Sequence, residues 1–363
     1  MKNSQKKSAV ILFNLGGPES LEAVKSFLFN LFNDKAIIGL PQPLRFLLAK
    51  FISSRRNKKA QKIYASIGGK SPLLDFTLAQ AHNLEKELSY FGDFKVFVSM
   101  RYTAPFALDV AKHVLEYNPT ETILLPLYPQ FSTTTSGSSL EDFATEITKS
   151  LKRENKKTNL KIVCCYPKEA DFIKSHALLI KQTLLKIYDN NLEQFHFLFS
   201  AHGLPQKVID AGDPYVFQVE VTTKEVVENL AQLLGVTSDK INFQICYQSK
   251  VGPMEWTKPN LELTLKRTIL NKKIPVIIPI SFVSEHSETL AELDIEYKEL
   301  AQKLGAKNYL RVPALNSDGH FIKSLVELCK RISSDEDSKC NSGQGKDRIC
   351  PKKFTKCPNP NFC

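Results

Sequence analysis

The sequence has no apolar run that approaches the roughly 20 residues needed to span a bilayer. It also lacks both glycine-rich phosphate-loop spacings, GxGxxG and GxxxxGKS/T, so these motifs predict no nucleotide site. It has no nucleic-acid recognition motif and no basic stripe interleaved with aromatic residues, so we expect no nucleic acid as a partner. Tryptophan occurs once and methionine three times.

What is present is an ordinary folded composition with an excess of positive charge. Hydrophobic residues make up 42% of the 363 residues and charged residues 24%. The formal net charge of +11 favours acidic partners, such as anionic lipid or a small polyanionic substrate. This length exceeds what one hydrophobic core usually organises, so we expect two lobes.

The amino-terminal segment superficially resembles a signal peptide. Its apolar part, Ala9–Leu15, is at the lower limit for such a peptide and runs into Gly-Gly-Pro with no small-residue cleavage site. We therefore interpret it as a first strand and expect a cytoplasmic protein.

Short apolar runs alternate with stretches of helical spacing along most of the chain. Near-continuous apolar strands separated by helical crossovers are typical of parallel sheets covered on both faces. The predicted strands, about four in each half, are Ala9–Leu15, Phe94–Arg101, Glu121–Tyr128, Lys161–Tyr166, Phe195–Ser200, Ile241–Tyr247, Pro275–Val283 and Tyr309–Val312. We therefore predict an α/β fold of two doubly wound, Rossmann-like lobes with four-stranded parallel sheets. Ligands are expected beyond the carboxyl ends of the strands.

We expect an amino-terminal lobe over residues 1–168 and a carboxyl-terminal lobe over residues 169–312. A helix over 313–333 is predicted to pack back on the first lobe. Residues 334–363 are predicted to form a cysteine-rich tail.

One histidine stands where chemistry is usual in such a fold. In "FHFLFSAHGLP", His202 follows the apolar strand Phe195–Ser200 and precedes a Gly-Leu-Pro turn. A ligand-facing side chain is expected at this carboxyl end. A structural histidine with satisfied hydrogen bonds is the alternative.

An acidic stripe follows another strand. Glu288, Glu292 and Glu296 recur every four residues, so they share one face of a predicted helix. Like charges at this spacing destabilise a helix by about 0.2–0.5 kcal/mol per pair. Asp294 is matched by Lys298 four residues later, whereas the stripe has no such basic partner. A solvated acidic face is the alternative to a functional one.

Glu285 and His286 precede this stripe at a strand end. Carboxylates leading to an imidazole suit a route for a divalent cation or for protons. Together with His202, Glu288 and His286 are predicted to bind a metal or to share acid–base work.

Several segments in order, from about residue 9 to residue 312, resemble the signature segments of the ferrochelatase family. They are "NLGGPES", "YPQFSTTTSGSSL", "SAHGLP", "QSKVGPMEW" and "SEHSETLAELDIEY". The resemblance implies a chelatase-like fold with an active-site cleft between two lobes. It also implies insertion of ferrous iron into protoporphyrin IX, which releases two protons and gives protohaem in the last step of haem biosynthesis.

The resemblance implies roles for the polar residues already described. His202 would accept the pyrrole protons, with Glu288 facing it, and both would contact the iron. His286 would take part in catalysis, and Glu285, Glu292 and Glu296 would form an acidic path for protons or metal.

The resemblance also implies a porphyrin-binding set. "SSRRNKKAQKIYASIGGKSP" matches the family's propionate-binding edge, although a solvated basic helix is the alternative. Trp256 would line the macrocycle, or else belong to the core. The implied contacts are Leu15, Arg56, Lys59, Tyr64, Ser71, Arg101, Tyr102 and Trp256.

The segment 24–56 is strongly apolar and then basic, which suits either a buried helix pair or an interfacial surface. In the family the equivalent region forms a lip over the pocket. Peripheral contact with the inner membrane is the corresponding expectation, and an oligomer is left open.

Four of the eight cysteines crowd the last two dozen residues, in a tail with little to pack. Their spacing does not match tight zinc motifs. Because some family members hold a [2Fe–2S] cluster there, the resemblance implies one on Cys340, Cys350, Cys357 and Cys363. Structural zinc and an unliganded tail are the alternatives.

Two other functions remain open from the sequence. One is a chelatase for coproporphyrin or another tetrapyrrole, and the other is a haem or metal carrier without turnover. The apolar segment 24–56 favours protoporphyrin over coproporphyrin, which carries two more carboxylates.

Overall fold

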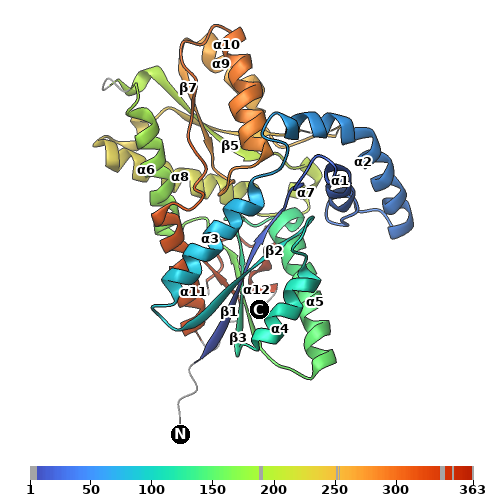
Figure 1. The fold of residues 1–363 in the computed structure, drawn as a ribbon. Helices are drawn as coiled ribbons and strands as arrows, with labels where there is room; N and C mark the ends of the chain where they lie inside the picture. The colour runs from blue at the N-terminus through green and yellow to red at the C-terminus, as the bar shows by residue number, and fades with distance from the viewer. Residues whose placement is uncertain are drawn as a thin grey trace. The chain divides into compact units, whose positions relative to one another are not determined.

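Two separate parallel sheets organise the chain (Figure 1). The computed structural model describes residues 6–187, 191–250, 252, 254–335, 340–345 and 347–361. The chain divides into two units, each with its own sheet. Unit 1 comprises 1–165, 325–349 and 358–363, and unit 2 comprises 166–324 and 350–357.

The sheet of unit 1 has the order β2-β1-β3-β4-β9. Its strands are β1 (Lys7–Asn14), β2 (Asp93–Met100), β3 (Glu121–Pro126), β4 (Asn159–Cys165) and β9 (Cys340–Ser342). The predicted four-stranded sheet is therefore wrong by one strand. The fifth strand comes from the cysteine-rich tail, where a three-residue strand with no apolar run gives no sequence signal, and its Cys340 pairs in register with Ile162 of β4.

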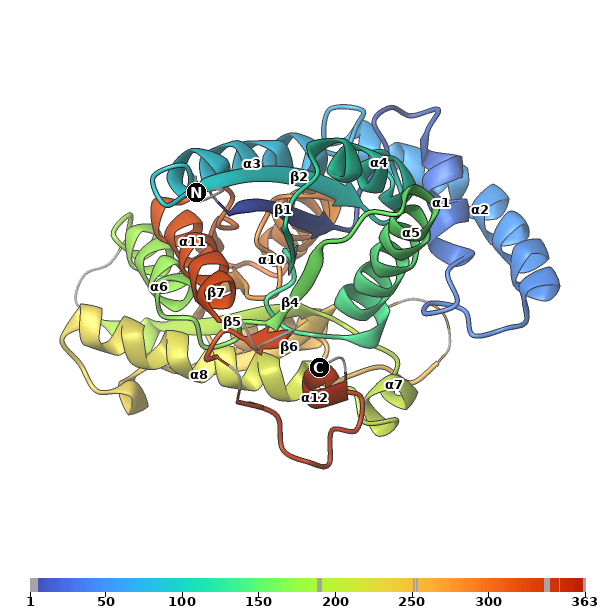
Figure 2. The same cartoon turned by 90° about the horizontal axis from the view of Figure 1, so that it is seen from below.

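Helices cover both faces of this sheet. The helices of unit 1 that precede β4 are α1 (Val24–Phe32), α2 (Gln42–Ala65), α3 (Leu73–Leu88), α4 (Ala107–Tyr117), the π-helical turn η1 (Thr133–Gly137) and α5 (Ser138–Glu154). Ala9, Ile11 and Phe13 of β1 pack against α4 and α5 in a fully buried cluster. The opposite face meets α3, since Asn14 Nδ2 donates to Thr77 Oγ1 at 3.0 Å. Figure 2 shows α3 lying over β2 and β1.

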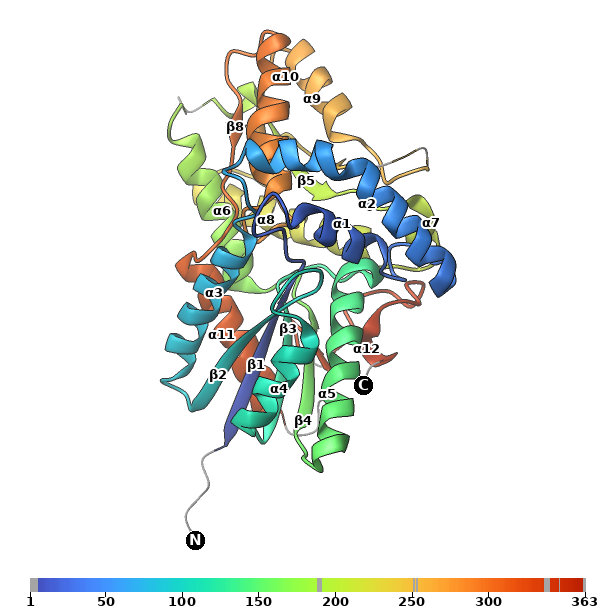
Figure 3. The same cartoon turned by 45° about the vertical axis from the view of Figure 1, so that its right-hand side comes forward.

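α1 and α2 form a helix pair outside this layer, visible side by side in Figure 3. Val24, Phe27 and Leu28 of α1 are buried with Tyr64 of α2. α2 in turn exposes Leu44, Phe46, Leu47 and Phe51, which we name the α2 apolar patch.

The sheet of unit 2 has the order β6-β5-β7-β8. Its strands are β5 (Phe195–His202), β6 (Phe243–Gln248), β7 (Ile274–Pro279) and β8 (Leu310–Arg311). These four and the first four strands of unit 1 confirm all eight predicted strands. The register places His202, the last residue of β5, beside Gln248, the last residue of β6. The carboxyl ends of β5 and β6 therefore lie side by side at the same edge of the sheet.

The helices of unit 2 are α6 (Ala170–Leu184), η2 (Leu192–Gln194), α7 (Gln206–Asp210), α8 (Tyr215–Leu234), η3 (Ser238–Lys240), α9 (Leu261–Leu270), the π-helix η4 (Glu288–Glu296) and α10 (Tyr297–Lys303). Leu198 and Ile277 of the sheet pack with Leu265 of α9 and Leu293 of η4. This core places η4 against the face of the sheet.

The carboxyl-terminal elements are α11 (Gly319–Ser334), β9 and α12 (Pro358–Asn361). In unit 1 the buried Lys161 ammonium donates to the carbonyls of Ile332, Ser333 and Asp335 at 2.7–3.3 Å. These bonds satisfy carbonyls that a helix end leaves without a partner. Lys161 also pairs with the buried Glu121 at 2.9 Å, so the helix end is fixed to β3 and β4.

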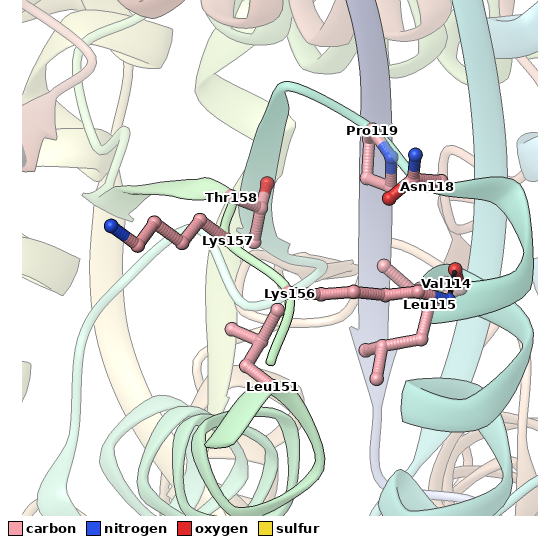
Figure 4. Close-up of a pocket in the computed structure, with 8 residues that line it drawn as sticks. All are labelled: Val114, Leu115, Asn118, Pro119, Leu151, Lys156, Lys157 and Thr158. Carbon is pink, nitrogen blue, oxygen red and sulfur yellow. Dashed lines mark hydrogen bonds between the residues drawn. The ribbon is translucent and has the colours of Figure 1, made fainter. Parts of the chain in front are cut away.

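None of the helices in the described part of the chain has the length and apolarity needed to cross a membrane. A small hollow of about 10 Å³ lies at the amino ends of β3 and β4, where Leu151 of α5 faces Val114 and Leu115 of α4 (Figure 4). It holds at most one water molecule. It also lies away from the carboxyl strand ends, so we treat it as a packing defect.

Candidate active site

A histidine and a carboxylate meet at the carboxyl end of the unit 2 sheet. His202 Nδ1 lies 2.8 Å from Glu288 Oε2, and the two side chains are 35% and 29% exposed. With an ionised carboxylate as acceptor, Nδ1 carries a hydrogen. Nε2, the other ring nitrogen, makes no hydrogen bond to a described residue.

Ser249 connects this pair to the next carboxylate. Its hydroxyl lies 3.2 Å from Glu288 Oε2 and 2.5 Å from Glu292 Oε2, and its amide donates to Glu292 Oε1 at 3.0 Å. Ser249 adopts a φ of 63°, a left-handed conformation that serine rarely takes. Gln248 adds bonds to the Glu288 carbonyl at 3.1 Å and to Glu292 at 3.3 Å. Tyr297 also donates to Glu292 at 3.2 Å.

The charges of this group shift one another. Burial lowers the pKa of His202, but the charge and hydrogen bond of Glu288 outweigh it, so that pKa is raised overall. Burial opposes ionisation of Glu288, yet His202 lowers the pKa of that carboxyl to about 2. Burial and the negative charge of Glu288 raise the pKa of Glu292. Glu288 is therefore the anion of the group, and Glu292 is the carboxylate that most readily takes a proton.

His286 lies two residues before η4 and contacts the backbone of Glu288. Its Nδ1 accepts the Glu288 amide at 3.0 Å, so this nitrogen carries no hydrogen. The ring packs edge-on to Phe282 with centroids 4.6 Å apart. Burial lowers the pKa of His286, which keeps the imidazole neutral.

The other two acids of the predicted path lie elsewhere. Glu285 is buried and pairs with Arg311 at 2.5 Å, and Glu296 is exposed near the end of η4. The sequence pairing of Asp294 with Lys298 is wrong, because Asp294 binds Arg311 at 2.7 Å. The predicted α-helix is a π-helix here, a difference that periodicity alone does not reveal.

A hollow of about 490 Å³ borders the His202 turn, and its lining includes Gly203, Gln248 and Trp256. Trp256 forms a bridge with Pro205, and a Cβ at Gly203 would lie 3.3 Å from the indole ring. This volume is within the range of small-molecule sites. The only tryptophan thus lies against the turn that follows His202.

In unit 1 the predicted contacts Arg101 and Tyr102 surround a buried acid. Asp34 Oδ2 lies 2.9 Å from the Arg101 guanidinium and accepts from Tyr102 and Ser138 at 2.8 and 2.5 Å. Arg101 also pairs with Asp142 at 3.3 Å. Tyr102 is 1% exposed, so its ring offers almost no surface to a ligand.

The remaining predicted contacts divide by exposure. Leu15 is half-buried, and Tyr64 is buried in the same cluster. Arg56 stacks over Phe32 at 5.7 Å, whereas Lys59 is exposed.

The two glycines of the "NLGGPES" loop lie in close contact with other segments of unit 1. Gly16 has a φ of 85°, and a Cβ there would lie 2.3 Å from Thr103 Oγ1. A Cβ at Gly17 would lie 2.4 Å from the hydroxyl of Ser71, which is itself buried. Glycine is required because three loops of unit 1 approach here.

Three tail cysteines lie within the described residues, and all three thiols are buried. Cys340 packs with Cys164 and Cys165 in unit 1. In unit 2 the amide of Gln218 lies 3.1 Å from the Cys350 sulfur, and Cys357 is 2% exposed. The fourth predicted ligand, at position 363, lies outside the described residues.

Cys340 is buried in an apolar cluster that also contains Phe131 and Ile162, whereas Cys350 and Cys357 are buried within the polar segment 350–357. Within the described ranges, no group of three or more His, Cys, Asp or Glu side chains is arranged to hold a metal ion.

Sequence reasoning missed Ser249, Gln248, Asp34 and Arg311. For Ser249 and Gln248 a signal existed, since polar residues directly after a predicted strand are candidates for a site in this fold. Asp34 and Arg311 gave no comparable signal. The partners of Asp34 are 67 to 104 residues away in the sequence, and those of Arg311 are 17 and 26 residues away.

The sequence profile of the ferrochelatase family matches residues 7–332. A ferrochelatase of Rickettsia bellii (strain OSU 85-389) is 52% identical over 362 residues, covering 98% of this chain and 96% of the relative. A ferrochelatase of Pelagibacter ubique (strain HTCC1062) is 46% identical over 361 residues, covering 98% and 99%.

Solved structures with the same fold include SirB from Bacillus subtilis with Fe³⁺. It has a TM-score of 0.52 and 13% identity, covering 92% of this chain and 99% of that one. The sirohydrochlorin chelatase SirB of B. subtilis subspecies spizizenii, in complex with cobalt, has a TM-score of 0.50 and 11% identity. It covers 91% of this chain and 97% of that one. These likenesses establish a chelatase-like α/β fold.

Proposed function

Because this chain belongs to the ferrochelatase family, we propose that His202 and Glu288 are the catalytic pair of its reaction. The chain is an enzyme that inserts ferrous iron into protoporphyrin IX to form haem. A non-catalytic carrier is thereby set aside, as is a chelatase dedicated to another tetrapyrrole.

One observation supports the proposed pair above all others. Glu288 binds Nδ1 of His202, and Nε2 makes no hydrogen bond to a described residue. A neutral imidazole in this tautomer presents a lone pair on Nε2. That atom is a base that accepts a proton from a pyrrole nitrogen as iron enters, and general-base catalysis of this kind contributes roughly 10²–10⁴-fold.

The same arrangement suggests where the protons go. His202 takes a proton on Nε2 and gives one from Nδ1 to Glu288 (distance 2.8 Å). The hydroxyl of Ser249 lies between Glu288 and Glu292, whose raised pKa suits a proton acceptor. Glu296 is the exposed acid that follows. His202 and Glu288 are also the iron contacts, with the neutral His286 fixing the Glu288 backbone.

We propose the porphyrin contacts separately for each unit. In unit 1 the cations Arg56 and Lys59, together with Ser71, would meet the propionates, and Leu15 would meet the macrocycle edge. Arg101 would act there through the network of Asp34, with the buried Tyr102 and Tyr64 supporting it. In unit 2 Trp256 would offer an aromatic face beside the His202 turn.

The experiment mixes the protein anaerobically with protoporphyrin IX and Fe²⁺ and follows the Soret and Q bands. Wild type converts many equivalents to haem. His202→Ala should lose roughly 10²–10⁴-fold in kcat while still shifting the porphyrin spectrum on binding. The exposed His113 of α4 provides the control, and His113→Ala should match wild type. A His202→Ala rate near that of wild type contradicts the assignment of the base.

We also propose that Cys340, Cys350, Cys357 and Cys363 hold a [2Fe–2S] cluster, which would supply cross-linking of the tail. Burial of the three described thiols supports this proposal. Anaerobically purified protein should contain two iron atoms and two acid-labile sulfides per chain. Cys350→Ser should lose them, whereas Cys246→Ser, a buried thiol of the unit 2 core, should keep them. One equivalent of zinc in place of iron and sulfide contradicts the cluster.

Finally, we propose a cytoplasmic location with peripheral contact to the inner membrane through the α2 apolar patch. Leu47 and Phe51 of this patch are each 62% exposed. Exposed apolar side chains beside lysines and arginines are typical of interfacial helices.

A further inference from the structure

Arg311 of β8 joins two points of the segment that carries Glu288. Its Nε donates to Asp294 Oδ1 at 2.7 Å, and its second terminal nitrogen binds the other Asp294 oxygen. Its first terminal nitrogen donates to Glu285 Oε1 at 2.5 Å. The Arg311 and Glu285 side chains are 12% and 8% exposed, so most of this ion-pair network is buried.

Neighbours of Arg311 hold the same segment. The Tyr309 hydroxyl donates to the Leu293 carbonyl at 2.7 Å. The Ala314 amide donates to Glu285 at 2.9 Å, and the Glu285 amide donates to Asn316 at 3.0 Å. The stretch 309–316 therefore binds Glu285, which precedes η4, and Leu293 and Asp294, which lie in the second half of η4.

Glu288, the first residue of η4, lies between these two contact points in the sequence. A π-helix is rare and is less favourable than an α-helix, so its surroundings must stabilise it. If η4 re-formed α-helical hydrogen bonds, fewer residues would fill each turn. The side chain of Glu288 would then rotate about the helix axis relative to the fixed end of β5, where His202 lies.

We propose that Arg311 is a positioning residue for iron insertion: its bridge between Glu285 and Asp294 holds η4 in the π-helical form that aims Glu288 at His202. This inference rests on the proposed role of the His202–Glu288 pair. It also gives Glu285 a different role from the acidic path, because its carboxylate binds Arg311 and the Ala314 amide, whereas Ser249 binds Glu288 and Glu292.

The test compares Arg311→Gln, Arg311→Lys and Asp294→Asn with wild type. A misplacement of about 1 Å in a catalytic group can cost roughly 10²-fold, so Arg311→Gln should lose roughly 10- to 100-fold in kcat and raise the KM for Fe²⁺. Porphyrin affinity, read from the Soret shift, should stay within about twofold because the macrocycle contacts are untouched. Arg311→Lys should recover only part of the rate, since one ammonium cannot bind two carboxylates as a planar fork.

A second readout does not depend on turnover. With ¹⁵N-labelled histidine, the Nδ1–H proton of His202 should resonate far downfield in wild type because it binds Glu288, and His202→Ala identifies the signal. Arg311→Gln should weaken or remove it. If wild type shows this signal but no turnover, the proposed function fails while the positioning role is still measured.

The control is Lys303→Gln, which removes an exposed ion pair with Glu299 from the adjoining α10 and should leave every readout unchanged. Wild-type kcat, KM and resonance in folded Arg311→Gln overturn the proposal. If Arg311→Gln does not fold, Asp294→Asn decides, because its side chain is 34% exposed and its loss leaves the buried Glu285 pair in place. Wild-type values in that variant then overturn the proposal.

Discussion

At the scale of single residues, the site depends on which groups are charged. A base must be neutral to accept a proton, yet the Glu288 carboxylate favours the imidazolium form of His202 by raising its pKa above the ordinary value near 6.5. The carboxylate that orients the base therefore also delays its deprotonation as the pH rises.

The pH dependence of kcat/KM should show this opposition. We expect activity to rise with pH through an apparent pKa above 6.5, because His202 loses its proton there. In Glu288→Gln the negative charge is gone, so burial dominates and the rise should move to lower pH while the maximum falls. Initial rates under anaerobic conditions across pH 5.5–9 would measure both. If the rise of kcat/KM with pH had the same apparent pKa in Glu288→Gln as in wild type, a group other than His202 would cause it.

The sequence predicted several residues of this site but not the hydrogen bonds that join them. His202, Glu288 and Glu292 were predicted from their positions after strands, and the structure brings them together. Ser249 was not predicted, because its role depends on a left-handed backbone and on two carboxylates about 40 residues away. Pairings across such separations follow from tertiary packing rather than from local pattern.

At the scale of elements, the fold followed from pattern where strands are long and apolar. All eight predicted strands are present, since a buried parallel strand leaves a continuous apolar run. β9 was missed because it contains one cysteine, one asparagine and one serine. η4 was predicted as an α-helix, since the two helix types share similar spacing over two turns.

The anchoring of α11 to the unit 1 sheet supplies a prediction about stability. Lys161 and Glu121 are each 1% exposed, and Lys161 also caps the last carbonyls of α11. Lys161→Met leaves Lys6 as the remaining cation at the buried Glu121 and removes the donor to the last α11 carbonyls, so it should lower the free energy of unfolding by about 1–3 kcal/mol. Urea denaturation followed by circular dichroism measures it.

The matched control for Lys161→Met is Lys149→Met, which breaks an exposed pair with Glu146 on α5. It should change the free energy of unfolding by less than about 0.5 kcal/mol. Although burial opposes ionisation of Glu121, its bonds to Lys6, Ser333 and Lys161 lower its pKa, so its contribution should be present near neutral pH and lost as the medium becomes acidic. If Lys161→Met and Lys149→Met lowered the free energy of unfolding equally, Lys161 would not anchor α11 to the sheet.

At the scale of the whole molecule, positive charge and exposed apolar surface act together. The chain carries a net charge of +11, and the α2 apolar patch lies on a helix that also contains arginines and lysines. Attraction to an anionic surface brings such a helix close, and burial of the apolar side chains then retains it.

We expect binding to vesicles that contain phosphatidylglycerol, weaker binding to pure phosphatidylcholine, and a loss of affinity at high salt. Leu47→Glu combined with Phe51→Glu should weaken binding at least about tenfold, because each large apolar side chain contributes about 1.5–3 kcal/mol when buried. Flotation measures the bound fraction. Leu270→Glu alters a leucine that is 76% exposed on α9 and should bind like wild type. Equal binding by all three proteins would place the contact elsewhere.

The short strand β9 has a consequence for expression of shortened chains. It pairs with Ile162 and Val163 of β4 at the edge of the unit 1 sheet. There it forms hydrogen bonds with β4 backbone N–H and C=O groups that would otherwise be unpaired. A chain cut after Ser334 would uncover that row of donors and acceptors. Such a truncation is therefore prone to intermolecular strand pairing and precipitation, whatever becomes of the thiols it removes.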